Sequence, residues 1–104
     1  MRAEVLSVTG CPHHAAAVER LRDVLASAGL AIEIEEHRVA DAAEAEALGL
    51  RGSPSVRIDG EDVEPATETP SLCCRVRTEG LDFLPTRGAM VRAIEAATRR
   101  REQP

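Results

Sequence analysis

The first cysteine of the chain stands in a sequence that could make its thiol reactive. Cys11-Pro12-His13-His14 lies between a short apolar run and a segment with helical periodicity. Backbone N–H groups at a helix N-terminus stabilise an anion, which favours the thiolate form of a cysteine placed there. We therefore predict that Cys11 is a nucleophile. His13 and His14 are either exposed residues of the first helical turn or neighbours that tune the thiolate.

Two further cysteines, Cys73 and Cys74, are adjacent in the sequence. Vicinal cysteines do not readily bridge each other, but either thiol could resolve an adduct on Cys11 or help to bind a soft metal ion. Cys74 could instead be a small buried hydrophobic residue. The odd total of three cysteines argues against a structural disulfide framework. With three histidines, one of them His37 on a separate predicted strand, a histidine-based zinc site is not expected.

Hydrophobic periodicity predicts the strand and helix on either side of Cys11. Residues 4–8 form an apolar run with β-branched members, typical of a buried strand. Pro12 suits the first turn of the helix that follows, because the N–H that proline lacks would have no partner there. Gly29 ends this helix. Its predicted buried face consists of Val18, Leu21, Val24, Leu25 and Ala28.

A second strand and helix are predicted next. Residues 31–39 alternate between apolar and charged side chains, which indicates a strand. Asp41 is suited to cap a short Ala- and Glu-rich helix, and Gly49 ends it. The side chains expected to point inward from this helix are Ala43, Ala47 and Leu48.

The second half of the chain predicts an antiparallel arrangement. Residues 55–58 and 61–63 flank Asp59-Gly60, a strong hairpin signal. Residues 72–76 are interpreted as a short extra strand. A final helix follows Pro85-Thr86, with an apolar face made of Met90, Val91, Ile94 and Ala97. We expect one domain over residues 1–98, and a frayed or disordered tail over residues 99–104.

The predicted order β-α-β-α-β-β-α is that of the thioredoxin superfamily, and two motifs strengthen the resemblance. Cys11-Pro12-His13-His14 occupies the place of the family's Cys-x-x-Cys motif, with His14 where the second cysteine stands. Ser53-Pro54 resembles the loop in which a cis-proline faces the active cysteine. The resemblance implies an α/β/α three-layer sandwich with a mixed sheet. It also implies a cis Pro54 beside Cys11, and substrate contacts from Pro12, His13, Ser53 and Pro54.

A second resemblance involves the later cysteines. Ser71-Leu72-Cys73-Cys74-Arg75-Val76, followed by Leu84-Pro85-Thr86, is similar to the catalytic segment of alkylmercury lyases, which use two cysteines and an aspartate. The resemblance implies that Cys11 and Cys73 are soft ligands for Hg(II) or an organomercurial. His14 then stands where the family has its proton-handling aspartate.

Composition excludes several classes of partner. The net charge of −5 and the single aromatic residue leave neither a basic stripe nor stacking platforms for nucleic acid. The sequence contains neither an apolar run long enough for a membrane span nor a glycine-rich phosphate loop, and we expect no signal peptide. We expect a cytoplasmic protein that needs no organic cofactor.

Three functions remain open. The leading hypothesis is a thiol-disulfide oxidoreductase that acts on a protein or small-molecule thiol or disulfide, with Cys11 as nucleophile and Cys73 or Cys74 as the resolving thiol. The second is an alkylmercury lyase-like or mercury-binding protein. The third is a non-catalytic binding module that keeps the fold while Cys11 is inert.

Overall fold

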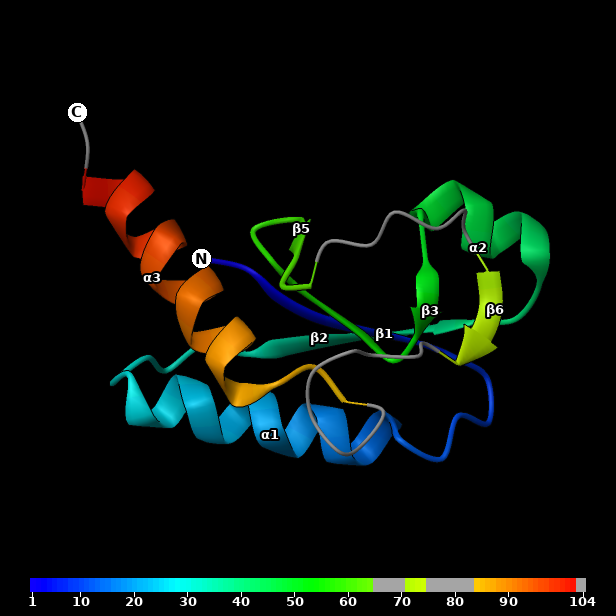
Figure 1. Cartoon of the computed structure of the whole chain (residues 1–104), viewed down its shortest axis with the longest axis horizontal. Helices are drawn as coiled ribbons and strands as arrows, with labels where there is room; N and C mark the ends of the chain where they lie inside the picture. Colours follow the sequence, from blue (N-terminus) through cyan, green and yellow to red (C-terminus); the bar gives the residue numbers. More distant parts are fainter. Residues whose placement is uncertain (65–70, 75–83, 103–104) are drawn as a thin grey trace.

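The chain folds as a mixed α/β protein (Figure 1). The computed structural model describes residues 1–64, 71–74 and 84–102. In chain order the elements are β1 (Ala3–Val8), α1 (His14–Ser27), β2 (Ile34–Val39), α2 (Ala42–Leu48), β3 (Arg51–Ser53), β4 (Ser55–Ile58), β5 (Glu61–Asp62), β6 (Ser71–Cys74) and α3 (Arg87–Glu102). None of the helices in these ranges is long and apolar enough to cross a membrane.

Four strands form a mixed sheet in the order β2-β1-β4-β5. β1 is parallel to β2 and antiparallel to β4, which confirms the predicted mixed sheet. The predicted hairpin is also present, because β4 and β5 are antiparallel and Asp59 and Gly60 both have positive φ, 53° and 84°. A two-residue turn of this conformation matches the twist of the strands that it joins.

The two faces of the sheet are covered by different helices (Figure 1). Ala3 and Val5 of β1 belong to the larger apolar core, which α1 and α3 complete. Leu6, the residue after Val5, faces the other way and contributes to a smaller core with Ala45 of α2. This alternation follows from the period of two in a strand, and it assigns every residue of β1 to one helix layer or the other.

The helices differ from prediction at several side chains. Asp41 caps α2 as expected, accepting a hydrogen bond from the Glu44 N–H at 2.8 Å. Ala43, Ala47 and Leu48 are exposed rather than inward, because the seven-residue helix turns one narrow face, Ala45, to the sheet. Ala28 and Val91 were also wrongly assigned to buried faces and are exposed, whereas the other predicted core residues of α1 and α3 are buried.

Two element boundaries also shift. β2 begins at Ile34 rather than residue 31. α3 runs through Glu102 and includes Arg99, Arg100 and Arg101, which stand in the segment predicted to be a frayed tail. Arginines in a last helical turn interact favourably with the negative end of the helix dipole.

A second, two-stranded sheet was not predicted. β3 pairs in parallel with β6, and the register places Arg51 opposite Ser71 and Ser53 opposite Cys74. β6 is the extra strand expected at residues 72–76, although residues 75 and 76 lie outside the described part of the chain.

Candidate thiol site

Cys11 is a buried residue at the junction of β1 and α1, with 8% of its surface exposed. Its backbone N–H donates to the Val8 carbonyl at 3.0 Å, and its carbonyl accepts from the His14 N–H at 3.4 Å. α1 begins at His14, so the expectation that Cys11-Pro12 opens the helix was wrong by about one turn. Pro12 and His13 form a turn before the helix, with His13 as the N-cap residue.

Ser53 connects the site to β1. Its hydroxyl accepts a hydrogen bond from the Val8 N–H at 3.1 Å, and Ser53 is completely buried. Because the Val8 carbonyl receives the Cys11 N–H, Val8 joins Ser53 to Cys11 through two hydrogen bonds. The peptide bond between Ser53 and Pro54 is cis, as predicted.

His14 is the residue whose surroundings differ most from expectation. It was expected either to be exposed or to tune the thiolate, and only 2% of its surface is exposed. Its Nδ1 lies 2.6 Å from the Ser7 hydroxyl, and its Nε2 lies 2.7 Å from Glu36 Oε1. Both ring nitrogens are therefore hydrogen-bonded, which accounts for burial of the imidazole without an unsatisfied polar atom.

Sequence reasoning missed both partners of His14. A signal was available, because Ser7 follows Val5 by two residues and Glu36 follows Ile34 by two residues, so each lies on the α1 face of its strand. Ser7 is wholly buried on a strand face that carries the apolar Ala3 and Val5, so its hydroxyl requires a polar neighbour. The alternation could not name that neighbour.

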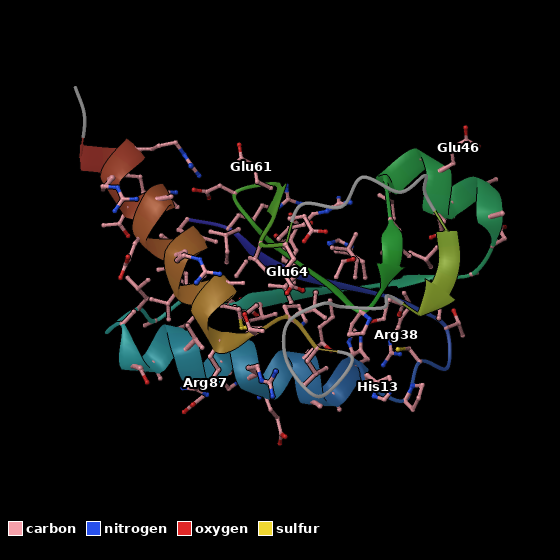
Figure 2. All side chains as sticks on the ribbon, viewed as in Figure 1. His13, Arg38, Glu46, Glu61, Glu64 and Arg87 are labelled. Carbon is pink, nitrogen blue, oxygen red and sulfur yellow. The ribbon has the colours of Figure 1, made fainter. Side chains whose placement is uncertain are left out.

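The charged residues around the start of α1 come from several elements. Figure 2 shows His13 where α1 begins and Arg38 at the same end of the molecule. Arg38 is the register partner of Ser7 on β2. His13 is half-buried and Arg38 is exposed. Side chains from the turn before α1 and from β2 therefore lie at this end of the molecule.

Cys73 and Cys74 are described only through their strand. Cys74 is the residue of β6 opposite Ser53, whereas Cys73 is not a register partner of β3. We predicted that one of these two thiols approaches Cys11. The side chains of Cys73 and Cys74 lie outside the described part of the chain. Among the described residues, no group of three His, Cys, Asp or Glu side chains is arranged to bind a metal ion.

A separate cluster of charges occupies the opposite face of the sheet. The buried Glu4 lies 3.0 Å from His37 Nε2 and 3.6 Å from an Arg2 nitrogen. Arg2 also donates a hydrogen bond to Glu35 at 2.6 Å, and this bond holds the pKa of the Glu35 carboxyl below its ordinary value. Burial opposes the shift, and the charge of Arg2 adds to it.

Comparison with known proteins gives no relative from which a function could be taken: no family model, curated protein sequence or solved structure matches the chain.

Proposed function

We propose that the protein has a thioredoxin-like fold and carries out thiol-disulfide exchange through Cys11. The observation that carries the proposal is the pair of hydrogen bonds by which Val8 joins Cys11 to Ser53, the residue before Pro54. The cysteine at the end of β1 and the loop before β4 are thereby neighbours. The sheet order β2-β1-β4-β5, with α1 and α3 on one face, is consistent with that fold.

The proposed reaction begins when the Cys11 thiolate attacks one sulfur of a disulfide R–S–S–R′. A bond forms between Cys11 Sγ and the R sulfur, and R′–S⁻ leaves and takes a proton from water. A second thiolate then attacks Cys11 Sγ and releases R–S⁻, which is protonated in turn. Two electrons pass from the protein to the substrate, and a low-molecular-weight thiol or dithiol reduces the protein again.

The second thiolate must come from outside the Cys11-Pro12-His13-His14 segment, because His14 replaces the cysteine that would resolve the adduct. We assign this step to Cys74 rather than Cys73. Cys74 stands opposite Ser53 in the β3–β6 pair, and Ser53 is bound to β1 next to Cys11. Backbone register therefore favours Cys74 as the nearer of the two residues.

Mercury binding is a second candidate, favoured by the same backbone register of Cys74 with Ser53, because two cysteines could together supply thiolates to a soft metal ion. Carbon–mercury cleavage has less support. It needs a proton donor free to reach the carbon, and both ring nitrogens of His14 are already bonded to Ser7 and Glu36.

The test is a reaction of the reduced protein with oxidised glutathione, followed by intact mass spectrometry. Wild-type protein should first gain one glutathione and then lose it as an intramolecular disulfide forms. Cys11→Ser should gain none, and His37→Gln, a substitution on the other face of the sheet, should behave as wild type. Glutathionylation of the Cys11→Ser variant at the wild-type rate would refute the proposal.

A further inference from the structure

Three hydrogen-bonded side chains, Ser7, His14 and Glu36, extend from the interior of the protein to its surface. Ser7 is wholly buried on β1 and His14 is buried at the start of α1, while 51% of the Glu36 side chain on β2 is exposed. Both hydrogen bonds are short, at 2.6 and 2.7 Å. Because Ser7 is inaccessible, this arrangement is not a hydrolytic triad with serine as the nucleophile.

The donor and acceptor chemistry of the three side chains determines which hydrogen bonds they can keep when His14 gains or loses a proton. An ionised Glu36 only accepts hydrogen bonds, so Nε2 of His14 must carry a proton. Nδ1 then has two options: it accepts from the Ser7 hydroxyl when the ring is neutral, or donates to the Ser7 oxygen when the ring is charged. A hydroxyl can play either part. His14 thus keeps both hydrogen bonds in either charge state, although it is buried.

His14 lies close to Cys11 along the backbone. His14 is three residues after Cys11, and its backbone N–H points to the Cys11 carbonyl. The other ionisable groups facing this place are His13 in the same turn, and Glu36 and Arg38 on the α1 face of β2. Of these, Glu36 is the only one that the described part of the chain shows bonded to the His14 ring.

We propose that Glu36 is a positioning residue for Cys11, acting through His14. It fixes the orientation of the imidazole, and through the His14 backbone it fixes the turn that carries the Cys11 thiol. Ser7 completes the arrangement, because its hydroxyl can hydrogen-bond the Nδ1 atom of His14 whether the ring is neutral or charged. The inference rests on the proposed role of Cys11 as a nucleophile and identifies what controls its reactivity.

Glu36→Gln is the decisive variant, because glutamine keeps an oxygen for Nε2–H and removes the charge. Glu35→Gln is the matched control, since it is the same substitution at the next position of β2, on the opposite face, where Glu35 pairs with Arg2. The readout is the rate of Cys11 alkylation by iodoacetamide between pH 5.5 and 8.5, followed by peptide mass spectrometry. It reports on this thiol alone.

At pH 7 we expect Glu36→Gln to slow Cys11 alkylation by about threefold to tenfold, and to change the shape of the pH profile. Glu35→Gln should remain within about twofold of wild type. Equal rates and equal profiles for the two folded variants would overturn the inference. A loss of thermal stability in Glu36→Gln with an unchanged profile would do so too, because it would indicate a purely structural role.

A measurement on the wild-type protein covers the case in which Glu36→Gln does not fold. Coupling between two groups is reciprocal, so blocking Cys11 with iodoacetamide should alter the pH dependence of the assigned His14 ring resonances in NMR spectra. Unaltered resonances would refute the coupling. Failure of glutathione exchange in a protein whose Cys11 alkylation depends on Glu36 would refute the proposed function and leave this inference standing.

Discussion

The Ser53 hydroxyl accepts a hydrogen bond from the Val8 N–H at 3.1 Å, across 45 residues of sequence. A second hydrogen bond, from the Cys11 N–H to the Val8 carbonyl, holds the loop that carries the thiol. The position of Cys11 therefore depends on a buried serine of β3.

Ser53→Ala should destabilise the protein by about 1 to 3 kcal/mol, because the Val8 N–H would lose its partner in a buried place. Cys11 alkylation should change as well, since the loop after β1 would no longer be fixed. Urea denaturation measures the first effect. Thr98→Ala deletes a hydroxyl on the exposed side of α3 and serves as the control. A Ser53→Ala protein as stable as Thr98→Ala would contradict the prediction.

Cys11→Ser should abolish disulfide exchange and leave the fold intact. Cys11 stands in a loop and contributes one small side chain, so the melting temperature should stay within about 5 °C of the wild-type value. Circular dichroism and glutathione exchange measure the two effects. A variant that unfolds would show that Cys11 is chiefly a core residue.

Cys74→Ser should trap the mixed disulfide between Cys11 and glutathione, whereas Cys73→Ser should resolve it as wild type does. The reason is the β3–β6 register, in which Cys74 and not Cys73 is opposite Ser53. Intact mass spectra over time distinguish the two variants. If Cys73→Ser accumulates the adduct instead, the assignment of the resolving thiol is wrong.

Stoichiometric Hg(II) should protect Cys11 from alkylation in wild-type protein, and much less so in Cys74→Ser. Two thiolates hold a soft ion better than one. Protection that is equal in wild type, Cys73→Ser and Cys74→Ser would indicate that Cys11 binds the metal without a second cysteine of this chain.

The Arg2–Glu35 pair should make a small contribution to stability that depends on pH. Arg2 lowers the pKa of Glu35 in the folded state, so this contribution is present above the carboxyl's ordinary pKa and is lost as the pH falls through the lowered folded value. Arg2→Gln should therefore melt below wild type at pH 7, and the pair's share of that difference should shrink as the pH falls below the ordinary pKa of a glutamate carboxyl. A difference that grows on acidification would contradict this sign.

Much of the fold was predictable because it depends on local sequence. The apolar run at residues 4–8, the Asp59-Gly60 turn and the Asp41 cap each act within a few residues, and each has the expected structure. The start of α1 was misjudged by about one turn, since a proline signals the beginning of a helix without fixing which residue caps it.

The sequence by itself determined the four strands of the mixed sheet, the hairpin and the place of Cys11 between a strand and a helix, since hydrophobic period and turn chemistry are local properties. Only the tertiary structure decided the neighbours of that thiol. The pairing of Ser53 with Cys74, the bond from Val8 to Ser53 and the bonds of His14 to Ser7 and Glu36 all require the register of separate strands. Alternation tells which face a side chain occupies, and strand register tells which residue it meets there.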